Sequence, residues 1–144
     1  MFKIHAPDIA EKAQPGQFVI MRIDERGERI PLTLVDWGKV KGTITIIFQE
    51  VGVSTRKLGA FEVEHAILNV VGPLGNPSDI KQNGSMAMVC GGVGTAAAYP
   101  IAKAFKEAGN KVVSIVGART ESHLIWENEM KNVSDEFYVS TDDG

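Results

Sequence analysis

The sequence predicts a protein of two parts: a strand-rich first half, forming a small barrel or sandwich, and a second half built on a parallel sheet with helices. Two observations predict this division. Short apolar and β-branched runs, punctuated by glycine and proline, fill the first half, which is typical of small all-β folds. After a polar segment at Asn76–Gln82, strand and helix patterns alternate, which favours right-handed strand–helix–strand units. We therefore expect two domains, residues 1–78 and 79–144.

Four short runs predict the strands of the first half. Pro15-Gly16 introduces the first run, and Gly72-Pro73 is expected to stop the last one, because proline cannot donate a hydrogen bond to a strand ladder. Threonine and isoleucine alternate in the third run before it becomes wholly apolar. The four runs are Gln17–Ile23, Ile30–Val35, Gly42–Phe48 and Ala66–Val71.

The second half alternates between strand and helix patterns. Gly109-Asn110 gives its first helix a C-terminal stop, and Pro100 lies in that helix's first turns, where a missing N–H costs least. Thr120 or Ser122 is expected to cap the second helix. The predicted elements are, in order, a buried strand at Met86–Cys90, a helix at Thr95–Ala108, a strand at Lys111–Val116, a helix at Glu121–Lys131 and a strand at Phe137–Ser140.

The composition excludes several classes of protein. The net charge is −3 with acids and bases mixed, so no basic stripe for nucleic acid is expected. The single cysteine, Cys90, cannot form an internal disulfide or hold a cluster alone, and His5, His65 and His123 lack ligand spacing, so no metal site is expected. No apolar run reaches about 18 residues and no signal peptide leads the chain, so we expect a cytoplasmic protein without a membrane span.

A glycine-rich turn follows the predicted strand at Met86–Cys90. Gly92-x-Gly94-x-x-Ala97 fits the dinucleotide-binding fingerprint, in which glycines let the backbone approach a phosphate and the next helix presents free N–H groups to it. The candidate binding residues of this turn are Gly91, Gly92, Val93, Gly94 and Thr95. A glycine turn can also do no more than join a strand to a helix, and this alternative stays open.

The next strand of the second half ends without the acid that a standard dinucleotide site places there. It ends instead in Gly117-Ala118-Arg119-Thr120. An arginine at this position suits a phosphate on the ribose, or the adenine face by stacking, and Thr120 would lie beside it. The alternative is a solvated surface arginine. The sequence thus predicts a nucleotide site of a non-standard kind.

Several segments resemble the ferredoxin–NADP reductase superfamily. Glu28–Thr33 resembles its flavin-binding strand, Val51–Thr55 its pyrophosphate loop, and Val71–Gly75 the segment that leaves the flavin barrel. The superfamily also shares the Gly-Gly-x-Gly-x-Ala turn and the Gly-Ala-Arg strand end. Together with Pro15–Phe18 and Asp142–Gly144, these segments most resemble flavin-containing electron-transfer subunits, such as those of dihydroorotate dehydrogenase, sulfide dehydrogenase and NADH-dependent ferredoxin–NADP oxidoreductase.

The resemblance implies a Greek-key, flavin-binding β-barrel followed by a partial three-layer α/β domain that binds NAD(P). It implies FAD and either NADPH or NADH as cofactors. Thr33 would lie beside the reactive nitrogen of the flavin, which makes it the candidate catalytic residue, although it also fits an ordinary strand threonine. The remaining candidate flavin-binding residues are Arg29, Pro31, Leu32, Ile47, Phe48, Gln49, Gly52, Ser54 and Thr55. Ile47 and Phe48 also fit a barrel core, and Ser54 and Thr55 fit a plain helix cap.

The sequence departs from the superfamily pattern in two respects. Leu32 replaces the aromatic residue, and Arg29 lies one place earlier than the superfamily's arginine, which would fall at Ile30. On a strand, a one-residue step turns the side chain to the other face, so either a bulge restores the arginine or phosphate binding depends on Ser54 and Thr55. The chain also lacks the superfamily's longer lead and its later strands, so we expect a fragment of a longer protein.

The resemblance implies an oxidoreductase subunit that passes a hydride from NAD(P)H to FAD and electrons to an iron–sulfur or flavin-containing partner. A [2Fe–2S] centre would belong to a missing C-terminal segment or to a partner subunit. The alternative is a cofactor-binding or docking module without turnover of its own. A homo-oligomer through exposed sheet edges stays open. The choice between NADH and NADPH and the electron acceptor are left undecided.

Overall fold

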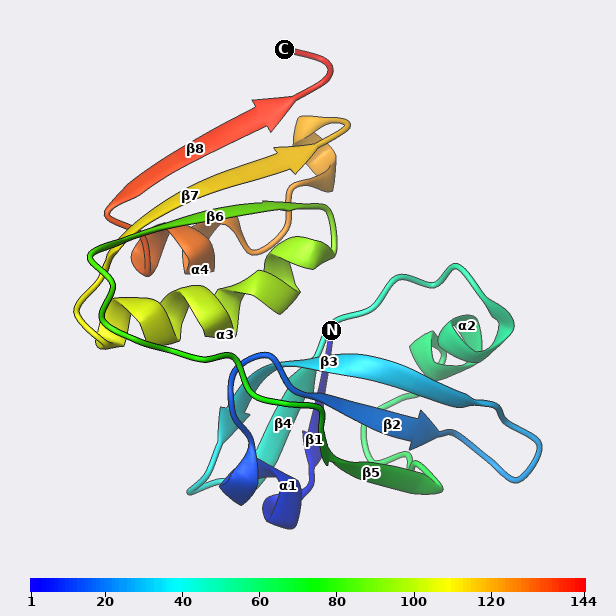
Figure 1. Ribbon diagram of the computed structural model, residues 1–144. Coiled ribbons are helices and arrows are strands. Elements are labelled where there is room, and N and C mark those ends of the chain that lie inside the picture. Colours follow the sequence, from blue (N-terminus) through cyan, green and yellow to red (C-terminus); the bar gives the residue numbers. More distant parts are fainter. The chain divides into compact units, whose positions relative to one another are not determined.

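The computed structural model describes residues 1–144, and the chain divides into two compact units, Met1–Pro77 and Ser78–Gly144 (Figure 1). Each unit has its own hydrophobic core. The first unit contains β1 (Phe2–His5), α1 (Pro7–Lys12), β2 (Phe18–Arg22), β3 (Arg29–Gly38), β4 (Thr43–Ile46), α2 (Val53–Gly59) and β5 (Asn69–Leu74). The second contains β6 (Ser85–Gly91), α3 (Gly94–Glu107), β7 (Lys111–Ala118), the 3-10 helix η1 (Glu121–His123), α4 (Glu127–Asn132) and β8 (Glu136–Thr141).

The first unit is a five-stranded antiparallel sheet with the order β1-β4-β3-β2-β5. β1 lies beside β4 rather than β2, which is the non-sequential neighbour of a Greek key. β1 and β5 are the two edges of the sheet, so it is barrel-like but not closed. The predicted fold class is confirmed in this form. β1 and α1 are additional to the predicted elements.

The side chains of β2 and β3 alternate between the core and the outer face of the sheet. Met21 and Val19 face the core, and the residues paired with them, Ile30 and Leu32, pack against it. Period-two alternation therefore turns Arg29, Pro31 and Thr33 to the opposite, outer face. The pairing of β2 with β3 is regular from Arg29 to Thr33, so no bulge changes the facing of these residues.

β5 corrects one sequence-based expectation, because Gly72-Pro73 lies inside the strand and does not stop it. β5 is an edge strand, so the N–H that proline lacks costs no hydrogen bond in a central ladder. Gly72 also packs closely against β2, since a Cβ there would meet Val19 Cγ1 at 2.6 Å. The strand accordingly runs from Asn69 to Leu74, later than the predicted Ala66–Val71.

The second unit is a three-stranded parallel sheet with the order β6-β7-β8, and α3 and α4 pack on the same face of it (Figure 1). Ala102 and Phe105 from α3 and Met130 from α4 meet the fully buried Val112 and Val116 of β7. The other face of the sheet has no covering helix. Val89, Ile115 and Tyr138 lie opposite one another across that face and are 75%, 38% and 53% exposed.

The predicted helix at Glu121–Lys131 is wrong as a single element. η1 ends at His123, the backbone is extended at Leu124, and Trp126 adopts the left-handed conformation with φ 54° before α4 begins. The Trp126 ring packs edge-on against Tyr99 of α3 at 4.8 Å between centroids. Thr120 takes the N-cap position of η1, but its side chain makes no capping bond.

Polar contacts fix the start of the β7–β8 pair. Asp135 Oδ2 accepts a hydrogen bond from the Val112 N–H at 2.8 Å, and the same carboxylate forms an ion pair with Lys106 of α3. The hydrogen bond from Lys106 and that from the Val112 backbone lower the pKa of Asp135. Lys111 and Glu136 pair beside it at 2.5 Å, which raises the pKa of Lys111 and lowers that of Glu136.

Candidate cofactor-binding sites

The glycine turn joins the end of β6 to the start of α3, and its three glycines have different reasons to be there. A Cβ at Gly91 would lie 3.1 Å from the carbonyl oxygen of Gly117 on β7, so the close packing of the two strands favours a glycine. Gly92 has φ +52°, which favours glycine. A Cβ at Gly94 would meet no atom of the protein within 4 Å. Neither packing nor backbone conformation therefore explains Gly94, and open space lies beside it.

The start of α3 has the character of an anion site. The helix is 14 residues long, its N-cap residue Val93 makes no side-chain capping bond, and no acidic residue occupies the first turn. The N–H groups and the helix dipole at this end favour negative charge. The space beside Gly94 opens at the same point. A phosphate group fits both properties of this turn.

Thr95 and Cys90 lie behind the turn. Thr95 is fully buried, and its hydroxyl oxygen has no conventional hydrogen-bond partner, although the Cys90 thiol is close enough to interact with it. Burial raises the pKa of the Cys90 thiol, and the Thr95 hydroxyl offsets this only in part. Cys90 therefore remains protonated at neutral pH, which fits a small half-buried strand residue.

Arg119 and Thr120 follow β7 at the same edge of the sheet as the glycine turn. Gly91 pairs with Gly117 in the parallel ladder, so the ends of β6 and β7 lie side by side. Arg119 is exposed. Thr120 Oγ1 lies 2.9 Å from Ser122 Oγ and 2.5 Å from His123 Nδ1, so its hydroxyl belongs to a small polar cluster in the loop.

A pocket of about 660 Å³ lies at this edge of the sheet, between the η1–α4 segment and the end of β8. Its polar lining includes the carboxylates of Glu121, Glu127 and Asp143 and the hydroxyls of Ser140 and Thr141. The sequence predicted a site only at the end of the second strand, and this pocket was not predicted. The signal available was Asp142-Asp143 directly after the third strand, because carboxyl ends of parallel strands share one edge.

The predicted flavin strand of the first unit is β3. Arg29, Pro31 and Thr33 share its outer face, and Thr33 lies directly opposite Phe18 of β2. Leu32 faces the core, so its side chain is turned away from the other three. No bulge restores Arg29 to the superfamily's position, so Arg29 shares the face of Thr33 and is turned away from that of Ile30.

The predicted pyrophosphate loop lies at the start of α2. The Gly52 N–H donates to Thr55 Oγ1 at 3.0 Å, and the same hydroxyl donates to the Gly52 carbonyl at 3.1 Å, which is the geometry of a helix cap. Ser54 Oγ donates to Glu28 Oε2 at 3.5 Å. This contact joins the start of α2 to the residue before Arg29, so the loop and the flavin strand are neighbours in the fold.

The segment after β4 is split between core and surface. Ile47 and Phe48 are half-buried, Gln49 is exposed, and the Phe48 ring stacks on Phe2 with centroids 5.5 Å apart. Phe48 also packs against the hydrophobic core of the first unit. The core role therefore accounts for Phe48, while Gln49 is open to solvent.

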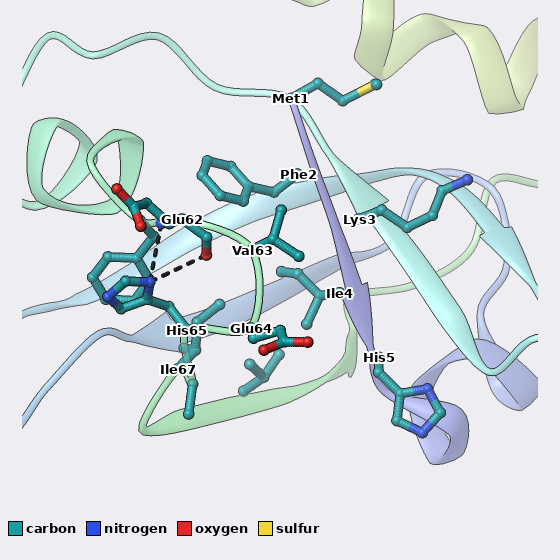
Figure 2. Close-up of a pocket in the computed structure, with 13 residues that line it drawn as sticks. Met1, Phe2, Lys3, Ile4, His5, Glu62, Val63, Glu64, His65 and Ile67 are labelled. Atoms are coloured by element: carbon teal, nitrogen blue, oxygen red, sulfur yellow. Dashed lines mark hydrogen bonds between the residues drawn. The ribbon is translucent and has the colours of Figure 1, made fainter.

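A second pocket, of about 710 Å³, lies between β1 and residues 61–67 of the first unit. Figure 2 shows Phe2 and Ile4 of β1 and Val63 of the facing loop around it, with His65 Nδ1 contacting the backbone of Glu62. None of the predicted cofactor-binding residues lines it.

No group of three or more histidine, cysteine or acidic side chains is arranged to hold a metal ion. None of the helices has both the length and the apolar composition needed to span a bilayer.

Comparisons with known proteins agree with the segments that suggested a family. No family model matches the chain. It is 49% identical over 143 residues to the dihydroorotate dehydrogenase B (NAD(+)) electron transfer subunit homolog of Thermotoga maritima, covering 99% of this chain and 50% of that protein. It is 35% identical to the electron transfer subunit of dihydroorotate dehydrogenase B from Bacillus caldolyticus, covering 94% of this chain and 54% of that protein. The chain thus spans about half the length of the curated relatives it matches.

Solved structures show the same relationship. A chain of the NADH-dependent reduced ferredoxin–NADP oxidoreductase superposes with a TM-score of 0.94 and 47% identity, over 99% of this chain and 52% of that one. The cytochrome P450 CYP116B46 of Tepidiphilus thermophilus matches with a TM-score of 0.75 and 17% identity, which shows a shared fold alone. The predicted resemblance to electron-transfer subunits of the ferredoxin–NADP reductase superfamily is confirmed.

Proposed function

We propose that this chain, which resembles the flavin-containing electron-transfer subunits of the ferredoxin–NADP reductase superfamily, belongs to an oxidoreductase that passes a hydride from NAD(P)H to FAD. Electrons would then pass to an iron–sulfur partner. The observation that carries the proposal is Gly94, a glycine that neither packing nor backbone conformation requires, at the uncapped start of a 14-residue helix. The space beside it suits a cofactor phosphate.

The second unit is the nucleotide-binding part of the proposal. The backbone of Gly92, Val93 and Gly94 would hold the pyrophosphate, with N–H groups of the first turn of α3 donating to it. Thr95 would keep its hydroxyl behind the turn, beside Cys90, where it fixes the packing of the strand end. Arg119 and Thr120 would contact the ribose or the adenine from the end of β7.

The first unit is the flavin-binding part of the proposal. The flavin phosphates would be held mainly at the start of α2, where Ser54 adds a hydroxyl, because no bulge brings Arg29 to the position of the superfamily's arginine. Thr33, on the same face of β3 as Arg29, would donate its hydroxyl hydrogen to the flavin ring. Thr55 would act mainly by holding the loop, since its hydroxyl already bonds to both polar groups of the Gly52 backbone.

The chemistry itself would come from the cofactors, since a flavin accepts an electron pair as hydride and releases the electrons one at a time. The side chains would bind and orient the two cofactors. No proton transfer is assigned to the proposed contact residues. The iron–sulfur centre would belong to a partner subunit or to a further part of the protein.

The visible absorption spectrum tests this proposal. The purified chain, supplied with FAD and freed of excess, is expected to show bound flavin that anaerobic NADH or NADPH bleaches. A second candidate is a cofactor-binding module without turnover, which the uncovered face of the β6-β7-β8 sheet favours, because such a face is normally covered in α/β folds. Bound flavin that neither nucleotide bleaches would favour the module. A chain that binds no flavin would contradict both.

A further inference from the structure

Gln17 is a buried polar residue that the proposed function does not use. Its side chain is 8% exposed, and both ends of its amide form hydrogen bonds. The Gln14 N–H donates to Gln17 Oε1 at 3.0 Å, and Gln17 Nε2 donates to the Gly75 carbonyl oxygen at 2.9 Å. The Leu34 N–H donates to the Gln17 carbonyl oxygen at 3.0 Å. Gln17 therefore joins the loop after α1, the strand β3 and the end of β5 at one point.

The pairing of β2 with β5 is irregular directly beside Gln17. Phe18 pairs with Leu74, but the next pair, Ile20 with Val71, lies two residues further along β2 and three residues earlier in β5. One extra residue of β5 therefore forms a bulge, and a bulge locally disrupts the ladder of hydrogen bonds. The Gln17 side chain supplies a further bond to the strand end just beyond this irregular stretch.

The bulge adjoins the row of side chains on which a flavin ring would lie. Directly paired residues of antiparallel strands share a face, so Thr33, Phe18 and Leu74 form one row across the outer face of the sheet. The Phe18 ring lies against Gly75, because a Cβ there would meet Phe18 Cε1 at 3.0 Å. The place of Phe18 beside Thr33 therefore depends on where Gly75 is held, and Gln17 holds it.

We propose that Gln17 is a positioning residue of the flavin site, which holds the row of Thr33, Phe18 and Leu74 in place for the flavin ring. The inference rests on the proposed function, in which Thr33 donates to that ring, and it adds a residue that acts through its neighbours. A side-chain amide suits this role, since it accepts at one end and donates at the other without carrying a charge. Without it, buried backbone groups lose their partners and the end of β5 is free to shift.

The full chain loaded with FAD tests the inference through the bound flavin itself, without turnover. The readouts are the FAD dissociation constant and the visible circular dichroism of the bound flavin, which depends on how the ring is held. In Gln17→Leu, which is similar in size but forms no hydrogen bonds, we expect FAD to bind up to about tenfold more weakly and the visible band to lose intensity. The matched control is Gln14→Leu, because the Gln14 side chain is exposed and only its backbone bonds to Gln17. Both readouts are expected to stay at the wild-type values in this control.

The variant Gln17→Glu separates positioning from folding by a rescue. Its carboxylate can accept from the Gln14 N–H, but only the protonated form can also donate to the Gly75 carbonyl oxygen. Burial raises the pKa of a carboxyl group, so protonation is expected between about pH 8 and pH 5. We expect the visible band of the bound flavin to be weak at the upper pH and to recover at the lower one. The wild-type band is expected to stay constant over the same range, because an amide does not titrate.

The outcomes separate this inference from the proposed function. If the folded wild-type chain binds no FAD, the proposed function is wrong and the inference falls with it. If the wild type binds FAD and a folded Gln17→Leu chain keeps its affinity and its visible band, only the positioning role is wrong. If Gln17→Leu does not fold, Gln17→Glu decides, since a band that does not recover on acidification would overturn the inference.

Discussion

Replacing Gly94 by alanine separates the demands of the fold from those of a ligand. A Cβ at Gly94 meets nothing within 4 Å, and the residue is the first of α3, with φ outside the range that favours glycine. Alanine is the better helix former by up to about 1 kcal/mol. Gly94→Ala is therefore expected to leave the free energy of unfolding unchanged or to raise it by up to about 1 kcal/mol.

The same methyl group is expected to weaken nucleotide binding. It would occupy the space where a phosphate meets the backbone N–H groups of the turn and would force the phosphate outwards. A hydrogen bond to a charged group contributes about 1.5–3 kcal/mol, and losing one weakens binding by about 10- to 150-fold. FAD binding, which is assigned to the first unit, is expected to stay as in the wild type.

The matched control is Gly91→Ala, in the same turn. Its Cβ would lie 3.1 Å from the Gly117 carbonyl oxygen, so β6 and β7 must separate slightly, and we expect a loss of about 1–3 kcal/mol of stability. Thermal unfolding by circular dichroism and NADH titration calorimetry measure both variants. A Gly94→Ala protein that unfolds like the wild type and binds NADH equally well would refute the assignment of the open space to a phosphate. A lower melting temperature would refute the steric argument itself.

Three further predictions concern the flavin side, the edge strand and the pH dependence. Ser54→Ala is expected to lower FAD affinity in a fluorescence titration without changing Tm. Thr55→Val removes a helix cap and should cost about 1 kcal/mol of stability. A Ser54→Ala protein that binds FAD as tightly as the wild type would count against a role of this loop in flavin binding. Gly72→Ala should lower Tm by several degrees, because its Cβ would lie 2.6 Å from Val19, and an unchanged melting curve would contradict this contact. The pKa of Asp135 is lowered, so its stabilisation is complete above its unfolded value of 3.8 and is lost as pH falls below that. Tm should therefore fall more steeply between about pH 4 and 2 in the wild type than in Asp135→Asn, and parallel curves would show that this carboxylate's contacts contribute nothing.

The sequence by itself determined the features that depend on local spacing. The strand at Met86–Cys90, the glycine turn and the helix that ends before Gly109 follow from apolar runs and from the conformational freedom of glycine, and all three appear in the structure within one or two residues. The alternation along β3 also follows from a local period of two. The sequence left open whether a bulge restores Arg29 to the superfamily's position, and the regular register of β2 with β3 shows no bulge there, so Arg29 faces opposite to Ile30.

Tertiary structure decided what depends on neighbours far away in the chain. Gly72-Pro73 stays inside a strand because β5 is an edge, and strand order cannot be read from a local pattern. The helix expected at Glu121–Lys131 is broken at Trp126, whose ring packs against Tyr99 of another helix. The pocket at the carboxyl edge of the sheet exists because a parallel register brings the end of β8 beside the loop after β7. Its acids come from three separate segments, and only the folded sheet places Glu121, Glu127 and Asp143 around one cavity.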